Sequence, residues 1–180
     1  MPSTGAIIAG TGASLAGIGT VAWTLPGNIV ASDNSSATAS LNSNAVSRWL
    51  VATNFDFSSI PDDAVILGVT GTIEGKYTGA NAATITSASF VVGDAVAGTA
   101  KTLSLTLTSS DANYTVGGAN DLWGYGITPA VLKVSTTGFA ISCTGATVSL
   151  ATVDAMWLTV TYMVAGRVFR TRRVRRTNRH

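Results

Sequence analysis

The sequence is poor in the residues that most hydrolases and metal proteins use. It has one cysteine, Cys143, and one histidine, His180, which is the last residue. A single cysteine cannot form an internal disulfide and fits folding in a reducing compartment. The last residue of a chain rarely supports catalysis, which argues against triads built on this histidine. Zinc sites need three or four nitrogen and sulfur ligands, more than one cysteine and one histidine provide. We therefore expect Cys143 to be a buried, inert thiol, and we predict no enzyme activity and no cofactor.

Carboxylates are the other side chains that could support catalysis or bind a metal, and few of them lie in a suitable pattern in this sequence. Asp62 and Asp63 follow Pro61, a combination typical of a turn, and a hard-cation site there is the minor alternative. Asp111 and Asp121 lie in polar loops where the sequence indicates no partner. The glycine-rich stretches match no phosphate-binding pattern, because none runs from a strand into a helix with a following lysine. We predict no metal site.

Charge is scarce throughout most of the chain. Charged residues make up 11% of it and hydrophobic residues 46%, whereas soluble domains usually have roughly 25% charged residues. Free monomers rely on surface charge to stay apart, so a surface of Ser, Thr, Gly and Ala is typical of a protein covered by neighbours. We predict a homo-oligomer, with a trimer favoured.

Long hydrophobic runs are absent as well. The apolar stretch from Ile7 to Val21 is interrupted by Gly and Thr, and no basic residue precedes it. It is too short to cross a bilayer. We predict no signal peptide, no transmembrane helix and no membrane partner, and we interpret this stretch as an extended arm or a first strand.

The few charges are distributed unevenly. Residues 1–166 contain four basic and nine acidic residues, a net charge of −5, whereas residues 167–180 contain seven arginines and no acid. Arginine pairs well with carboxylates on a protein partner, and interspersed apolar residues could add anchors. Binding of this segment to nucleic acid is the less favoured alternative. The predicted partner-binding residues are Arg167, Val168, Phe169, Arg170, Arg172, Arg173, Val174, Arg175, Arg176 and Arg179.

Alternation of apolar and polar residues with period two predicts β-strands. It is clearest in 64–76, 101–108 and 154–164. In the first run it places Val65, Leu67, Val69 and Ile73 on one face, and in the last it places Met156, Leu158, Val160 and Tyr162 together. Threonine fills much of the outer faces. Weaker patterns predict further strands at 47–55, 85–92, 138–143 and 147–151.

These patterns predict an all-β fold, a single antiparallel β-sandwich of about eight strands. The expected sandwich covers residues 20–165, with extended arms at 1–19 and 166–180. The Ser-, Ala- and Asn-rich stretch 31–44 is expected to be a loop. One helical turn is expected at 128–132, where Thr128 can cap and Pro129 takes the first helical position.

The four tryptophans are the candidate material for ligand binding. Trp49 and Trp157 fall within predicted strands and are expected to be buried. Trp123 lies in a glycine-flanked loop, so we consider it the one candidate surface aromatic, able to stack on a sugar ring.

Four segments in order resemble a known family. They are GTVAWTLPGNIVASDNSSATASL (19–41), LVATNFDFSSIPDDAVILGVTGTIEGK (50–76), GGANDLWGYGITPA (117–130) and TGFAISCTGATVSLATVDAMWLTVTY (137–162). Together they resemble a jelly-roll-like β-sandwich domain of structural proteins in tailed-bacteriophage virions. The resemblance covers roughly residues 19–164. Asp56, Gly126-Ile127 and the start of the last strand at 153–156 depart from the family pattern, and the arginine-rich segment lies outside it.

The resemblance implies a jelly-roll-like sandwich and a structural virion role, with assembly in the host cytoplasm. Such domains occur at several places in the virion, so the position stays open. The leading expectation is a capsid decoration (cement) protein that binds the major capsid protein. The alternatives are a neck, collar or tail/fibre component, and a host-glycan adsorption module that uses Trp123.

Overall fold

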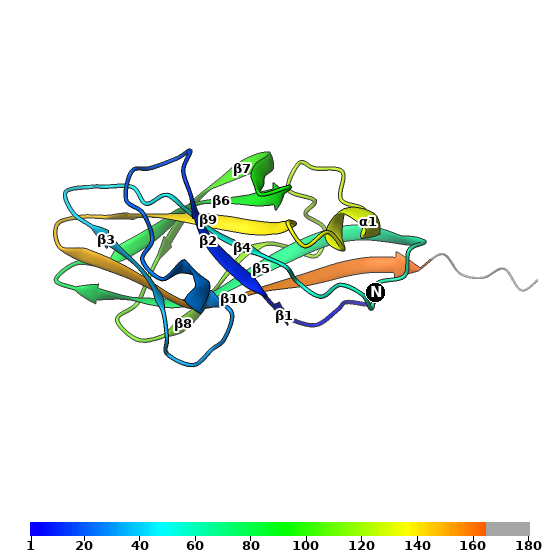
Figure 1. Ribbon diagram of the computed structural model, residues 1–180, viewed down its shortest axis with the longest axis horizontal. Helices are drawn as coiled ribbons and strands as arrows, with labels where there is room; N and C mark the ends of the chain where they lie inside the picture. The colour runs from blue at the N-terminus through cyan, green and yellow to red at the C-terminus, as the bar shows by residue number, and fades with distance from the viewer. Residues whose placement is uncertain (165–180) are drawn as a thin grey trace, which may run out of the picture.

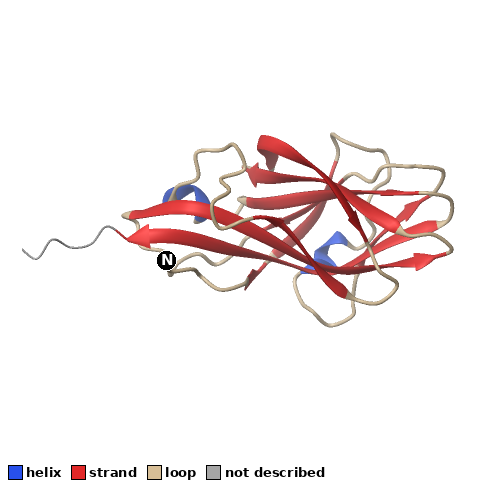
Figure 2. Ribbon diagram, turned by 180° about the vertical axis from the view of Figure 1, so that it is seen from behind, coloured by secondary structure: helices blue, strands red, loops and turns tan. Residues whose placement is uncertain are grey.

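The structure is a computed structural model that describes residues 1–164, and it is a sandwich of two antiparallel β-sheets (Figure 1). Seen from behind, the strands run along the long axis and the loops gather at the two ends (Figure 2). The all-β sandwich expected from the sequence is confirmed. Its strands are β1 (Ile7–Ile8), β2 (Thr11–Leu15), β3 (Ala37–Leu41), β4 (Trp49–Thr53), β5 (Ala64–Gly79), β6 (Ala83–Val92), β7 (Ala95–Thr106), β8 (Ala112–Gly117), β9 (Gly138–Gly145) and β10 (Ser149–Val164).

The strand order is that of a jelly roll. One sheet runs β3-β10-β5-β8, with β1 also pairing β10, and the other runs β4-β9-β6-β7, with β2 added beside β4. A jelly roll has eight strands in two four-stranded sheets, and most successive strands alternate between the two sheets. The two longest strands, β5 and β10, pair along most of their length and form the centre of the first sheet.

The N-terminal segment belongs to the sandwich, which corrects the predicted boundary at residue 19. β1 pairs with β10 in one sheet and β2 pairs with β4 in the other, so the first fifteen residues join the two layers. Ala9, between them, is buried, and its N–H donates to the Met156 carbonyl. The apolar character of 7–21 therefore reflects pairing within the domain.

Two further predictions were wrong for the same reason, because strand pairing overrode local composition. The stretch 31–44, expected to be a loop, contains β3, and alanines at every second position (Ala37, Ala39) face the core. The strand expected at 147–151 is continuous with the one expected at 154–164, and together they form β10. β8 lies in a region where no strand was expected.

β-Bulges explain a misassigned face. In β5, Val65 was expected on the same face as Val69, yet Val65 is exposed while Ile66 is buried. The register between β5 and β10 shifts at Thr161 and Tyr162, opposite Gly68 and Ile66. A bulge inserts an extra residue and reverses the alternation beyond it. The predicted inner face of β10, by contrast, is confirmed: Met156, Leu158 and Val160 are buried.

Two short helices close the loops. The predicted turn is α1 (Pro129–Leu132), where the Thr128 hydroxyl accepts from the Val131 N–H at 3.3 Å as expected. A 3-10 turn, η1 (Pro26–Ile29), packs against β2 and buries Ile29. Between the sheets, Phe57, Phe90, Trp123 and Phe139 are the largest fully buried side chains. Within residues 1–164, no helix is long and apolar enough to span a membrane.

Candidate functional site

The arginine-rich segment follows β10 at one end of the long axis, which we call the C-terminal pole. β10 ends there at Val164, beside the start of β5 and the N-terminus (Figure 1). The Tyr162 N–H donates to the Pro2 carbonyl at 3.2 Å. Val65, Met163 and Val164 are 53%, 46% and 46% exposed at this pole. Apolar surface therefore lies directly beside the point where residues 165–180 begin, and all ten predicted partner-binding residues lie outside the described residues.

A pocket of about 410 Å³ opens near the same pole. It is lined by residues 54–58 together with Lys133 and Ser135. The Phe55 and Phe57 side chains are buried, so they offer no exposed aromatic face. Asp56 accepts from the Ser58 N–H at 3.0 Å, and hydrogen bonds from Ser58 hold the pKa of the Asp56 carboxyl below its usual range. The side chains that line the pocket can form hydrogen bonds with a polar group. We assign them no further chemical role.

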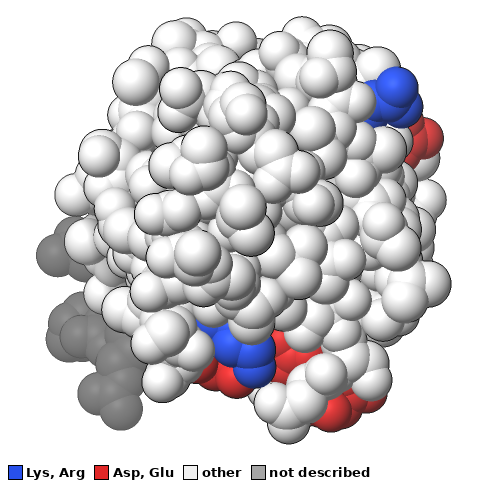
Figure 3. All heavy atoms as spheres, turned by 90° about the vertical axis from the view of Figure 1, so that its left-hand side faces the viewer, with Lys and Arg blue, Asp and Glu red and all other residues white. Residues whose placement is uncertain are grey.

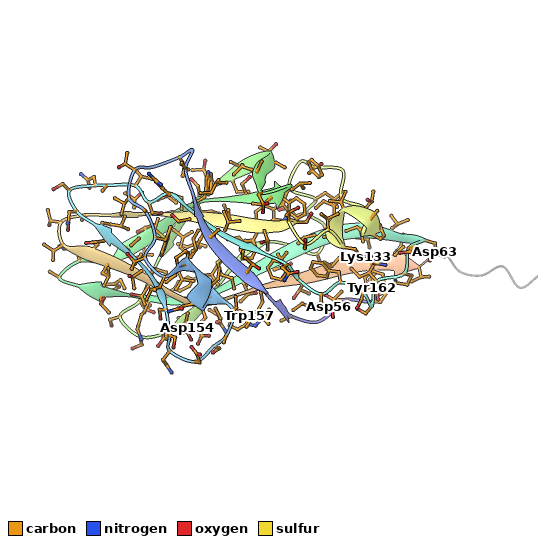
Figure 4. All side chains as sticks on the ribbon, viewed as in Figure 1. Asp56, Asp63, Lys133, Asp154, Trp157 and Tyr162 are labelled. Carbon is orange, nitrogen blue, oxygen red and sulfur yellow. The ribbon has the colours of Figure 1, made fainter. Side chains whose placement is uncertain are left out.

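Asp62 is engaged in an ion pair at this pole. The Lys133 ammonium lies 2.6 Å from its Oδ1, and this hydrogen bond lowers the pKa of the Asp62 carboxyl. Figure 4 places Asp63 at the tip, with Lys133, Tyr162 and Asp56 behind it. Residues 1–164 contain no group of three or more His, Cys, Asp or Glu side chains placed to hold a metal ion. The turn reading of 61–63 agrees with these contacts.

Trp123 is not a surface aromatic, which corrects the sequence prediction. Its side chain is 1% exposed, and its indole Nε1–H donates to the Val69 carbonyl at 2.9 Å. Its backbone N–H donates to Asp121 Oδ1 at 2.8 Å, and Lys101 Nζ lies 5.0 Å from the ring centroid. The glycines that flank Trp123 let the loop turn inward and insert the ring into the core. The glycan-adsorption alternative therefore loses the residue on which it depended.

The burial of Trp49 and Trp157 was predicted correctly only in part. Trp49 is buried as expected, but it packs in a small cluster with Val51, Val91 and Ala140, apart from the main core. Trp157 is only half-buried, because it lies on the opposite face of β10 from Met156 and Leu158. The expectation that both would be buried was met by Trp49 and only in part by Trp157.

Four carboxylates gather over the middle of the β10–β5–β8 sheet, and we call this group the acidic patch. Glu74 pairs in register with Ala155 of β10 and with Asn113 of β8. Lys76 Nζ lies 2.8 Å from Asp111 Oδ2. Asp154 occupies the register shift between Val153 and Ala155, where a bulge adds a residue to β10. The patch comprises Asp33, Glu74, Asp111 and Asp154, with Lys76 as the cation among them.

Asp154 is the buried member of this patch. Its side chain is 3% exposed, its Oδ2 accepts from the Asn34 N–H at 3.1 Å, and its Oδ1 has no hydrogen-bond partner among the described residues. Burial raises the pKa of the Asp154 carboxyl above its usual range, and the charges of Glu74, Asp33 and Asp111 raise it further. Lys76 offsets one of the four carboxylates, so the patch keeps an excess of acidic groups. Figure 4 places Asp154 far from the C-terminal pole.

The end opposite the C-terminal pole is almost free of charge. Figure 3 looks onto it and shows charged atoms only around its margin. Val148 at this end is 62% exposed and adopts a left-handed backbone with φ of 56°. Such a conformation is costly for a β-branched residue. This end matches the low-charge, small-residue surface that composition predicted.

Cys143 lies in the core, as expected. Burial raises the pKa of its thiol to about 12, so the side chain stays protonated at neutral pH. A protonated, inaccessible thiol does not act as a nucleophile.

Sequence reasoning missed the acidic patch entirely. Its members are separated by up to 121 positions. They meet through the pairing of β10 with β5 and of β5 with β8, and through the bridge between Val30 and Ala155, which brings the loop with Asp33 to β10. The sequence indicated no partner for Asp111, and in the structure its partner is Lys76.

No family model, curated protein or solved structure matches this chain.

Proposed function

We propose that this chain is a structural protein of a tailed-bacteriophage virion, in the role of a capsid decoration protein. In this role the sandwich sits on the outside of the shell, and the arginine-rich segment attaches it to acidic surface of another virion protein. The resemblance of residues 19–164 to phage sandwich domains supports the class. The jelly-roll fold fits it, although many functions use this fold.

The observation that carries the proposal is the separation of charge between body and segment. Residues 1–164 hold nine carboxylates and four basic residues, and the last strand leads at one pole into a segment with seven arginines. Exposed Val65, Met163 and Val164 beside that point can bury against the same partner. Arginine pairing combined with apolar anchoring suits attachment to a protein surface.

The glycan-adsorption alternative has no observation in its favour now that Trp123 is placed in the core. Neck, collar and tail components use the same kind of domain, and copy number separates them from a decoration protein. Quantitative mass spectrometry of purified particles tests the proposal. A decoration protein is present in proportion to the major shell protein, whereas a small fixed number of copies would move the chain to the neck or tail. Absence from purified particles would contradict a virion role.

A further inference from the structure

The acidic patch contains more carboxylates than the one lysine within it can offset. Lys76 pairs with Asp111, Lys101 with Asp121 and Lys133 with Asp62, so these three lysines are already engaged. The fourth basic residue of 1–164 is Arg48, whose Nε is buried without a hydrogen-bond partner among the described residues and whose charge is not among those that shift the pKa of Asp154. The seven arginines of 167–180 are the large remaining source of positive charge.

The patch is built to receive such a segment. Asp33 is exposed and Glu74 is half-exposed, so both present a carboxylate at the surface, and the exposed Asp111 is paired with Lys76. Beneath them, Asp154 adds a charge that is 3% exposed and carries an oxygen without a partner among the described residues. Guanidinium groups bind carboxylates in pairs of hydrogen bonds and lose little solvation in doing so. An arginine-rich strand laid over this sheet would offset the negative potential.

The geometry favours the segment of another molecule. From Ala155, opposite Glu74, β10 runs on to Val164 at the C-terminal pole. At about 3.3 Å per residue this distance is roughly 30 Å. A segment folding back onto its own body would need about nine residues to cover that distance, so Arg167, Arg170 and Arg172 would fall short of the patch and only the four arginines from 173 on could reach it. The segment of a neighbour is not limited in this way, because it does not start at the far pole of the same body.

We infer that the acidic patch of one copy binds the arginine-rich segment of a second copy. This inference goes beyond the proposed function: there the segment binds another virion protein, and here it binds a second copy of this chain. Patch and segment are different surfaces, so two copies can exchange segments in a two-fold dimer, or each copy can bind the next in a closed ring. A trimer, which is favoured for a capsid decoration protein, is one such ring.

The test uses the full chain and variants that reverse charge at the surface. In the patch variant, Asp33→Lys and Glu74→Lys reverse two surface carboxylates of the acidic patch. In the control, Asp56→Lys and Asp63→Lys make the same change in net charge at the C-terminal pole, where both residues are exposed. In the segment variant, Arg172, Arg173, Arg175 and Arg176 are replaced by Glu. Circular dichroism and thermal unfolding verify that each variant is folded.

Light scattering and sedimentation then report association at micromolar concentration. We expect the wild type and the control to associate, and the patch and segment variants each to associate at least about tenfold more weakly. Association of the wild type should weaken between 0.1 M and 1 M salt, as the Debye length falls from about 10 Å to about 3 Å. Equal association of patch variant and control would overturn the inference.

The decisive experiment mixes the patch variant with the segment variant. Each then carries the charge complementary to the other, so association should return in the mixture and not in either variant alone. No recovery on mixing would overturn docking between copies. A monomeric wild type that still binds particles through its segment would refute this inference and leave the proposed function standing. Patch-dependent association without particle binding would do the reverse.

Discussion

Trp123 is the residue that most clearly links a loop to the core. It has a left-handed backbone with φ of 56°, its indole N–H donates to the Val69 carbonyl, and its ring packs against Phe139 at a centroid distance of 6.3 Å. Glycines on both sides of the loop allow the close approach, and in Gly117 a Cβ would meet the Trp123 ring itself. The loop between β8 and α1 is thereby fixed to the first sheet through one side chain.

Replacing Trp123 with Ala should therefore destabilise the protein by about 3–5 kcal/mol, because it opens a large cavity in the core. Trp157→Ala should cost clearly less, since Trp157 is only half-buried on the outer face of β10. Trp49→Ala should fall nearer to Trp123→Ala, because that ring is buried. Chemical denaturation monitored by circular dichroism measures all three. Equal costs for Trp123 and Trp157 would contradict the assigned faces.

Asp154 makes stability depend on pH. Burial, followed by Glu74, Asp33 and Asp111, raises the pKa of this carboxyl in the folded state above the ordinary value of 3.8. The folded state then holds the proton over a pH range where the unfolded state has lost it, so stability falls as pH rises through that range. Asp154→Asn removes this loss and can still accept from the Asn34 N–H.

The expected result is that Asp154→Asn gains stability relative to the wild type on going from below pH 3.8 to neutral pH. Urea denaturation of both proteins across that range measures the difference. Glu74→Gln serves as the control, because it removes a neighbouring charge and should give a smaller gain in the same direction. A difference that does not change with pH would show that Asp154 ionises as freely in the folded protein as in the unfolded chain.

Among the secondary-structure elements, the two terminal segments play different parts. β1 and β2 pair in both sheets, and residue 9 between them is buried, so the N-terminal segment is part of the core structure. The arginine-rich segment follows Val164, the last described residue, which aligns with Ala64 at the start of β5. The first segment thus contributes to folding, and we assign binding to the second.

Deleting residues 1–15 should therefore abolish or strongly reduce cooperative unfolding, because both sheets lose an edge strand and Ile29 loses its cover. Deleting residues 165–180 should leave the unfolding transition of the sandwich in place. Calorimetry of the two truncated proteins provides the comparison. An N-terminal deletion with unchanged stability would restore the arm interpretation of residues 1–19.

The elements also mark how far the sequence could predict this structure. Local signals located three elements. They are the regular alternation in β7 and β10 and the Thr128-Pro129 cap of α1. β3 and β8 are short and rich in Ala, Asn and Thr, so pairing with long neighbours stabilises them more than their own composition does. Bulges at 154 and near 67 moved side chains between faces, and no local pattern indicates a bulge. The acidic patch depends on both effects.

For the molecule as a whole, the main feature is an acidic, low-charge body joined to a strongly basic segment. If that segment instead served nucleic acid, the full-length protein would bind duplex DNA with a log-log salt slope near −0.9 for each phosphate neutralised. We expect weak DNA binding, because −5 on the body opposes the approach of phosphates. Filter binding over a range of salt concentrations, with the chain lacking residues 165–180 as control, measures this slope. Tight, segment-dependent DNA binding would replace the protein-attachment account.

The central claim is that the arginine-rich segment attaches this sandwich to the virion. The most direct measurement compares occupancy of particles stripped of this protein by the wild type and by full-length protein with Arg172, Arg173, Arg175 and Arg176 changed to Gln. The account predicts saturable binding of the wild type, lower occupancy of the variant, and partial retention of wild-type binding at high salt through the exposed apolar residues at the C-terminal pole. Equal occupancy by the two proteins would contradict it.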